Sequence, residues 1–438
     1  MNYKLDNQRF GQPFRSNSAL NNNEAPTRIC ILGGGFGGLY TALYLQRFHA
    51  LSNRCQITLI DRKDHLVFTP LLYEVITNEL QPWEIAPTFK KLLINTNVAI
   101  CKGVVRGVDL ENRQVTFQHE EVGELDPNPT LLTYDYLVLA VGAEMRLDSV
   151  PGAATYAYLF RTVTDAERLK ERLRVLECSD QPIIRVAVVG GGPSGVELAC
   201  KLADRLPKRG QVRLIERGTE LLKSFSPYSR AAACRALHKR RVQLDFETSV
   251  EAIESDQITV VDNKGKTQTP VDLVLWTVGT RSIDWVRYLP CEHNSQGQLI
   301  VLPTLQLADY PEVFALGDIA EVQNARGKRI PATAQAAYQQ ADCTARNLYR
   351  AIAGKPQVRF RYLHLGEMLT LGKGAAVVSS FALKVDGRLA SIIRQFVYLQ
   401  RLPTLRHRLQ VLRYWIGKWL TKLIFPRRRS RNHRRHNR

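Results

Sequence analysis

The stretch Arg28-Ile-Cys-Ile-Leu-Gly-Gly-Gly-Phe-Gly-Gly-Leu39 decides the fold, because an apolar run breaks into glycines and then resumes with helical character. This pattern predicts a strand, a phosphate-binding turn and a helix. Gly33, Gly35 and Gly38 fit G-x-G-x-x-G, whose glycines allow a tight turn, close approach of a pyrophosphate and close packing of helix on strand. The next apolar run ends at Asp61, a carboxylate that suits a ribose hydroxyl pair. This context favours dinucleotide binding over a merely structural glycine loop.

A second copy of the pattern begins at Arg185. Gly190, Gly192 and Gly195 again form G-x-G-x-x-G after an apolar run, and Glu216 ends the run that follows. The first glycine precedes the acid by 28 residues in the first copy and by 26 residues in the second. Two copies in register indicate two mononucleotide-binding folds.

Each copy also contains a later buried strand that ends in a glycine turn, at Gly142 in the first copy and at Gly279 in the second. A glycine there suits close approach of a ligand to the backbone. A further strand ends at Gly317 and Asp318, and doubly wound sheets bind ligands at this end of their strands. Asp318 could hold a ribityl or ribose hydroxyl, and it could equally cap a helix. We therefore predict an α/β fold with two Rossmann-like dinucleotide-binding domains.

The length of 438 residues and the hydrophobic share of 45% predict a globular protein of two or three domains. No run reaches the roughly 18 to 20 apolar residues that cross a bilayer, and the polar first two dozen residues lack a signal-peptide core. We therefore expect the protein to stay in the cytoplasm. The eight cysteines show no close pair and no metal-ligand spacing, so we expect no metal site.

Positive charge gathers at one end of the chain. Residues 394–438 hold 14 Lys or Arg and no Asp or Glu, and removing these 14 charges from the formal net charge of +20 leaves +6. Over residues 405–424 apolar side chains recur at the period of one helix face, with Trp415 and Trp419 beside them. A basic amphipathic helix with tryptophans is typical of an interfacial anchor on anionic lipid. A helix packed on its own protein is the alternative, and nucleic-acid binding by the arginines fits poorly with the tryptophans.

The segment Ala334-Gln-Ala-Ala-Tyr-Gln-Gln340 opens a helix in which Gln335 and Gln339 lie four residues apart on one face. Their two amides could flank a polar carbonyl ligand.

Two dinucleotide folds in one chain are explained if one holds a flavin and the other a nicotinamide, so that hydride passes from ring to ring. Dithiol reductases of this architecture carry C-x-x-C or C-x-x-x-x-C beside the flavin, and neither spacing occurs. Electrons must then leave the reduced flavin directly for a diffusible acceptor. The glutamine pair and the amphipathic helix together suggest a lipid-soluble quinone.

From about residue 27 onward the chain resembles the type II NAD(P)H:quinone oxidoreductases, single-subunit flavoproteins that lie on a membrane surface. The matching segments are the FAD motif 33–38, the ring-wall segment 68–73, the NAD(P)H motif 190–195, the second FAD contact 317–318 and the A-Q-x-A-x-Q quinone motif 334–340. The resemblance implies non-covalent FAD, with NADH or NADPH as co-substrate. It places Gln335 and Gln339 near quinone and flavin. Glu197 matches a glutamate between the nicotinamide and quinone regions, with a helix first-turn glutamate as the plain alternative.

Within this family, residues 83–87, 272–280 and 366–372 look like the cyanobacterial and plastid branch. Members of that branch reduce demethylphylloquinone, a naphthoquinone, before the last methylation of phylloquinone biosynthesis. The arginine-rich end after Pro426 departs from the branch, which leaves the function of the tail open. Glu216 favours NADH because its carboxylate repels the 2′-phosphate of NADPH. Arg217 beside it could bind that 2′-phosphate, so the choice between NADH and NADPH stays open.

These patterns divide the chain into four expected parts. They are a flexible N-terminus at 1–26, an FAD-binding domain at 27–155 and 290–355, an NAD(P)H-binding domain at 156–289, and a C-terminal domain at 356–438 with a membrane-anchoring tail. We expect a peripheral protein on the cytoplasmic side of a plasma or thylakoid membrane. A homodimer is left open, and no nucleic-acid partner is expected.

Two other functions stay open. A sulfide:quinone oxidoreductase has a similar architecture, but its chemistry needs cysteines beside the flavin. Cys178 and Cys343 are candidates only because cysteines are present at these positions, since no motif supports them. A non-enzymatic flavoprotein redox sensor, or a nucleic-acid partner that acts through the tail, is the second alternative.

Overall fold

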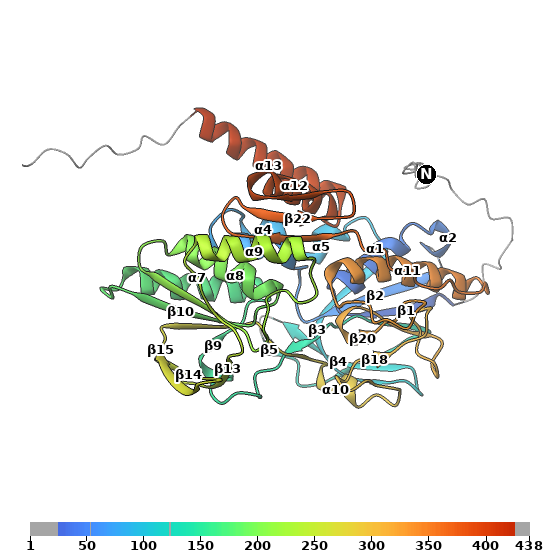
Figure 1. Cartoon of the computed structure of the whole chain (residues 1–438). Coiled ribbons are helices and arrows are strands. Elements are labelled where there is room, and N and C mark those ends of the chain that lie inside the picture. Colours follow the sequence, from blue (N-terminus) through green and yellow to red (C-terminus); the bar gives the residue numbers. More distant parts are fainter. Residues whose placement is uncertain (1–24, 53, 122–123, 425–438) are drawn as a thin grey trace, which may run out of the picture.

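The computed structural model describes residues 25–52, 54–121 and 124–424 (Figure 1). The expected flexible N-terminus at 1–26, apart from its last two residues, lies outside the described residues. The arginine-rich end after Pro426 lies outside them as well.

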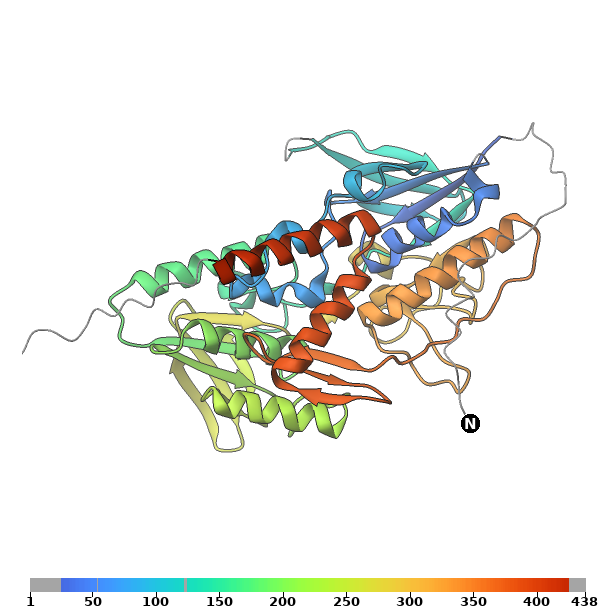
Figure 2. The same cartoon turned by 90° about the horizontal axis from the view of Figure 1, so that it is seen from above.

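The first sheet is the core of the N-terminal half. Its strand order is β19-β7-β1-β2-β3-β4-β5, with β6 paired to β4. The strands are β1 (Thr27–Leu32), β2 (Cys55–Asp61), β3 (Val98–Asp109), β4 (Gln114–Glu121), β5 (Glu124–Leu125), β6 (Thr130–Thr133), β7 (Tyr136–Leu139) and β19 (Val313–Ala315). From β19 to β3 the pairing is parallel, and these strands are apolar because helices cover the sheet. Helices α1 (Phe36–Leu45) and α11 (Ala334–Ile352) lie side by side (Figure 2).

A second, five-stranded parallel sheet repeats this plan, in the order β12-β11-β10-β16-β9. Its strands are β9 (Ala157–Tyr158), β10 (Ile184–Val189), β11 (Gly210–Ile215), β12 (Gln243–Asp245) and β16 (Leu273–Trp276). Its helices are α7 (Val163–Cys178), α8 (Pro193–Arg205) and α9 (Pro227–Lys239). An antiparallel sheet of β13 (Ser249–Ile253), β14 (Gln257–Asp262) and β15 (Gly265–Pro270) lies beside it. The predicted α/β fold with two Rossmann-like domains is confirmed.

Short elements complete the two halves. The segments that follow the two glycine turns pair with each other, since β8 (Glu144–Met145) is antiparallel to β17 (Thr280–Arg281). The other short elements are α2 (His49–Ser52), η1 (Thr69–Leu71), α3 (Tyr73–Ile76), α4 (Pro82–Ile85), α5 (Phe89–Leu92), α6 (Ala153–Tyr156), α10 (Asp284–Arg287), β18 (Leu299–Ile300), η2 (Gly317–Ile319) and β20 (Ala320–Glu321).

The C-terminal part consists of a small antiparallel sheet and two helices. The strands β21 (Glu367–Thr370), β22 (Ala376–Ser379) and β23 (Lys384–Asp386) lead into α12 (Gly387–Arg401) and α13 (Leu405–Ile424). Both helices lie along one side of the molecule, at the top of Figure 1. Among the described residues, no helix combines the length and the apolar character needed to span a membrane.

Candidate active site

The first glycine loop turns sharply at the end of β1. Gly33 has φ +97°, in the left-handed region that favours glycine, and a Cβ atom there would lie 2.4 Å from the carbonyl oxygen of Ala140. A Cβ atom on Gly38 would lie 1.9 Å from the carbonyl oxygen of Gly33. The turn and the close packing of helix on strand therefore both require glycine.

The second loop has the same geometry. Gly190 has φ +113°, and a Cβ atom on Gly195 would lie 1.8 Å from the Gly190 carbonyl oxygen. The repeat seen in the sequence is therefore a repeat in three dimensions. Each loop joins a strand with parallel neighbours on both sides to a helix.

The middle glycine of each loop faces open space. Around a Cβ built on Gly35 or on Gly192, the described residues place no atom within 4 Å beyond the chain neighbours. These glycines are also the N-caps of α1 and α8, and within the described chain neither helix start is capped by a side chain. The first N–H groups of both helices are thus available to phosphate oxygens, so the loops fit the pyrophosphates of FAD and of a nicotinamide dinucleotide.

The two predicted strand-end acids lie against their loops. Asp61 Oδ2 accepts a hydrogen bond from the Gly34 N–H at 2.6 Å, and Glu216 Oε2 accepts one from the Gly191 N–H at 2.6 Å. Each carboxylate therefore meets the glycine loop of its own sheet, and its contact with a ribose stays a prediction. Arg217, directly after Glu216, is exposed.

The glycines at the other strand ends lie at the same edge of the sheets. Gly142 and Gly279 follow β7 and β16 and lead into the paired strands β8 and β17. Gly317 donates its N–H to Gln340 Oε1 at 2.8 Å, which ties it to α11. Asp318 lies inside η2 with Oδ2 3.6 Å from Arg161 Nη2, so its plain interpretation as a helix N-cap is wrong.

The aromatic segment at 68–73 packs between helices of both halves and the C-terminal part. The Phe68 ring lies 5.3 Å from the Phe36 ring and 5.6 Å from the Tyr398 ring, centroid to centroid. Tyr73 donates its hydroxyl to Ser194 Oγ at 3.0 Å, at the start of α8. The sequence did not single out Tyr398, which completes this aromatic wall from α12.

Glu197 is buried, and it is the fifth residue of α8, so it lies beyond the first turn that the plain alternative assigned to it. Its Oε1 accepts a hydrogen bond from the Thr370 N–H at 2.8 Å and lies 3.6 Å from Arg394 Nη2. Burial raises the pKa of Glu197 to about 8, and Arg394 opposes this rise. At neutral pH this carboxyl group therefore holds its proton more often than not.

Glu197 is surrounded by a group of charged side chains. This group was not identified from the sequence. Arg394 Nη1 lies 2.5 Å from Glu74 Oε1, and Lys201 Nζ forms an ion pair with Glu79. Lys201 has no exposed side-chain surface. The available signal was a charged residue in an otherwise apolar stretch, as for Glu74 between Tyr73 and Val75. Charged groups are rarely buried unless they are paired.

Gln335 and Gln339 lie on one face of α11, as predicted, and both amides bind the segment at 362–366. Gln339 donates to the Leu363 carbonyl at 2.9 Å and accepts from the Leu363 N–H at 2.9 Å. Gln335 Oε1 accepts from the Tyr362 hydroxyl at 2.9 Å and from the Leu365 N–H at 3.0 Å. The structure brings the pair together, with partners from the chain itself.

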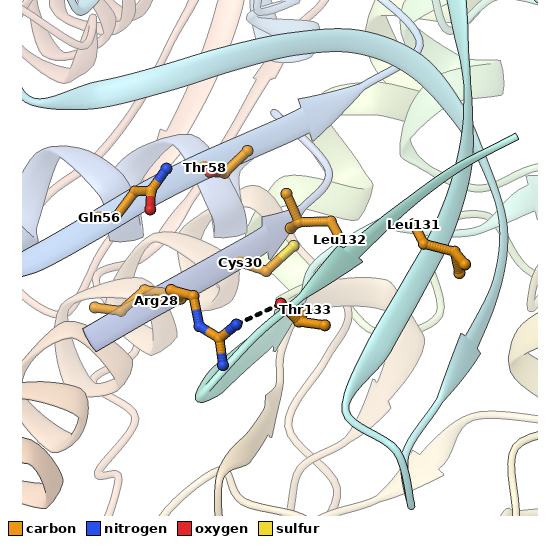
Figure 3. A pocket seen from close by; sticks show the side chains of 8 residues that line it. Arg28, Cys30, Gln56, Thr58, Leu131, Leu132 and Thr133 are labelled. Carbon is orange, nitrogen blue, oxygen red and sulfur yellow. Dashed lines mark hydrogen bonds between the residues drawn. The ribbon is translucent and has the colours of Figure 1, made fainter. Parts of the chain in front are cut away.

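A cavity of about 230 Å³ lies elsewhere, on the first sheet (Figure 3). It is lined by the N-terminal part of β1, by β2 and by β6, away from the glycine turn. Arg28, at its rim, hydrogen-bonds Thr133 and Asp135 and so is already paired.

All eight cysteines are free. Cys178 is the exposed last residue of α7, whereas Cys343 is buried in α11, so the two candidates for sulfide chemistry lie in different environments and form no pair. The sulfide:quinone alternative is therefore not favoured.

Comparison with known proteins agrees with this fold. The family model of the pyridine nucleotide-disulphide oxidoreductases matches residues 27–341. The chain is 43% identical over 402 residues to demethylphylloquinone reductase NdbB of Synechocystis sp., covering 91% of this chain and 98% of the relative. It is 38% identical to the chloroplastic/mitochondrial alternative NAD(P)H-ubiquinone oxidoreductase C1 of Arabidopsis thaliana, covering 90% of this chain and 81% of the relative.

Among solved structures, NDH2 of Plasmodium falciparum in complex with NADH superposes with a TM-score of 0.78 at 19% identity. The match covers 92% of this chain and 99% of that one. The fold and the two glycine loops define a two-dinucleotide flavoprotein reductase. The chain belongs to the pyridine nucleotide-disulphide oxidoreductases and, within them, to the FAD-dependent type II NAD(P)H:quinone oxidoreductases.

Proposed function

We propose that the protein transfers a hydride from NADH or NADPH, by way of FAD, to a naphthoquinone of the demethylphylloquinone class in phylloquinone biosynthesis. The observation that carries this proposal is the pair of matching glycine loops, each at the end of a strand with parallel neighbours on both sides, with no dithiol spacing between the cysteines. The naphthoquinone is supported by the 43% identity to a demethylphylloquinone reductase.

The chain's own residues bind and orient the reactants. We infer that FAD is held by Gly33, Gly35, Gly38, Asp61, Gly142, Gly317 and Asp318, and the nicotinamide dinucleotide by Gly190, Gly192, Gly195, Glu216 and Gly279. Bound FAD supplies a two-electron carrier between nicotinamide and quinone. The sheets support the proposed division of the chain, because β19, from residues 290–355, joins the sheet formed by residues 27–155.

We propose that Glu197 holds a proton for the reaction. Reduction of a quinone to a quinol takes up two electrons and two protons, and a hydride equivalent delivers both electrons but only one proton. A buried carboxyl group with a pKa of about 8 can supply the second proton at neutral pH. We propose that Gln335 and Gln339 shape the quinone region by holding the segment at 362–366 in place.

We also propose that the protein is peripheral on the cytoplasmic side of a plasma or thylakoid membrane. On α13 the apolar stripe points outward, because Leu405, Leu409, Ile416 and Trp419 are all exposed. The opposite face packs inward through Trp415, whose indole N–H donates to Glu84 Oε1. An exposed apolar stripe on a helix that is docked by its other face supports a lipid-binding surface.

Helix α12 extends this surface. Its side chains Leu389, Ile392 and Phe396 are exposed, although α12 also has a buried face. Arg406 and Arg413 flank the stripe on α13 and are exposed. Apolar side chains bordered by arginines suit the headgroup region of an anionic bilayer.

The proposed reaction is tested with purified protein. Flavin absorbance should be present, should bleach on anaerobic addition of NADH or NADPH, and should return on addition of a naphthoquinone. A panel of benzo- and naphthoquinones identifies the acceptor, and comparison of NADH with NADPH identifies the donor. Protein without flavin absorbance, or flavin that neither nucleotide bleaches, would refute the proposal. Sulfide-dependent quinone reduction without a nucleotide would favour the sulfide alternative.

A further inference from the structure

The buried charges around Glu197 do not balance. Among the residues that the structure describes, the cluster holds three carboxyl groups, those of Glu74, Glu79 and Glu197, and the cations in ion pairs with them are Lys201 and Arg394. Lys418 contacts the backbone carbonyl of Glu79 and not its carboxyl group. Because an uncompensated charge inside a protein is costly, this excess favours a proton on one carboxyl group of the cluster.

The distances indicate which carboxyl group carries it. Glu79 forms a direct ion pair with Lys201, and Glu74 Oε1 lies 2.5 Å from Arg394 Nη1 and 3.9 Å from Lys201 Nζ. Glu197 Oε1 is 3.6 Å from Arg394 Nη2, so Glu197 has the weakest ion pair of the three. The proton therefore belongs on Glu197.

The Glu74–Arg394 pair thus decides how much positive charge Glu197 receives. Arg394 contacts the carboxyl groups of both Glu74 and Glu197, and its contact with Glu74 is the shorter one. Arg394 Nη2 also donates to the Pro70 carbonyl, whereas within the described residues Glu74 Oε2 and Arg394 Nε have no hydrogen-bond partner. The titratable and charged groups around Glu197 are Tyr73 and Glu74 on α3, Glu79 after α3, Cys200 and Lys201 on α8, and Arg394 and Tyr398 on α12.

We propose that Glu74 and Arg394 are positioning residues for quinone reduction, which together set how tightly Glu197 holds its proton. Arg394 reaches the cluster from α12, 197 residues beyond Glu197 in the chain, so the proton affinity of Glu197 depends on the C-terminal helix being docked. The kinetic part of this inference rests on the proposed function, but the proton affinity itself can be measured without quinone.

Charge counting predicts opposite shifts for two variants. Glu74→Gln leaves two carboxyl groups and two cations, so Glu197 ionises more easily and its pKa falls. Arg394→Gln leaves one cation for three carboxyl groups, so the pKa of Glu197 rises. The double variant has two carboxyl groups and one cation, the same excess of one carboxyl group as in the unchanged protein. The proton affinity of Glu197 should therefore return toward its original value. Each single change should alter that affinity by at least about tenfold, which is one pKa unit.

The shifts are measured by pH-difference infrared spectroscopy of the holoenzyme, where the C=O band of the protonated carboxyl group is assigned to Glu197 by its loss in Glu197→Gln. The same samples give the pH profile of flavin reoxidation by 2-methyl-1,4-naphthoquinone. Arg394→Lys keeps the charge and should restore both readouts in part. Arg235→Gln is the matched control, because it removes an exposed ion pair to Asp386 at the start of α12 without touching the cluster.

Opposite shifts in the two single variants, with compensation in the double variant, support the inference. Shifts in the same direction, or no Glu197 band in the unchanged protein at neutral pH, overturn it. If Arg394→Gln does not fold, Glu74→Gln alone tests the inference. The introduced glutamine side chain still offers Arg394 a hydrogen-bond acceptor, and the pKa of Glu197 should fall. Failure of NAD(P)H to bleach the flavin refutes the proposed function instead and leaves the infrared result standing.

Discussion

The carbonyl oxygen of Gly33 lies 1.9 Å from the position that a Cβ atom on Gly38 would occupy. No real Cβ tolerates such a contact with backbone, so Gly38→Ala forces helix α1 away from β1. The middle glycine of the same loop behaves differently, because a Cβ on Gly35 meets open space. Gly38 is therefore needed for folding, whereas Gly35 is needed for binding of the ligand.

Gly35→Ala should fold normally but bind FAD at least about tenfold more weakly, because the added methyl group occupies the side of the loop that the pyrophosphate approaches. Thermal unfolding of the flavin-free protein and flavin titration measure the two effects. Gly192→Ala is the matched variant in the second loop, and it should keep its flavin but bleach only at higher NADH or NADPH concentration. Loss of flavin in both variants would contradict the assignment of the two loops.

Glu197→Gln should change how stability depends on pH. The pKa of Glu197 in the folded protein is raised by burial to about 8 from the ordinary 4.5, so the folded state binds the proton more tightly. The stability contributed by this proton is complete below about pH 4.5 and is lost as the pH rises through 8, by roughly 3–5 kcal/mol. The thermal midpoint of the unchanged protein should therefore fall relative to that of Glu197→Gln between pH 5 and pH 8. Parallel curves would show that Glu197 titrates normally.

Gln339→Leu should loosen the segment at 362–366. It removes the two hydrogen bonds to Leu363, each worth about 1 kcal/mol. Amide hydrogen exchange at Leu363 should accelerate roughly 10- to 30-fold, and quinone reduction should slow while flavin bleaching by NAD(P)H is kept. Arg346→Gln, on the same helix but in an exposed pair with Asp342, serves as the control. Loss of flavin bleaching as well would mean that the glutamine supports the whole fold.

Ile416→Glu should abolish most binding to vesicles that contain phosphatidylglycerol, because it places a charge in the exposed apolar stripe of α13. Gln410→Glu adds the same charge at an exposed position outside the stripe, so it should weaken binding only by the electrostatic part, a few-fold. Co-sedimentation measures both variants, and NADH-driven bleaching of the flavin should be unchanged in each. Equal losses in the two variants would indicate that charge alone holds the protein at the membrane.

The local parts of the site could be predicted from the sequence. The strand, glycine turn and helix around Gly33 and Gly190 are decided by residues next to each other in the chain, and Asp61 and Glu216 end strands whose apolar pattern is visible by itself. The turn geometry then follows from sterics, because only glycine fits the left-handed φ at Gly33 and the contact at Gly38.

The sequence by itself thus determined the two nucleotide loops, the strand-end acids and the presence of an amphipathic C-terminal helix, since each depends on short-range spacing. Only the tertiary structure decided which face of α13 is exposed, that Gln339 binds Leu363, and that Arg394 reaches Glu197 and Glu74. The reason is physical. The partner of a buried charge depends on the packing of segments that are hundreds of residues apart in the chain. The local sequence around each partner therefore does not predict the pairing.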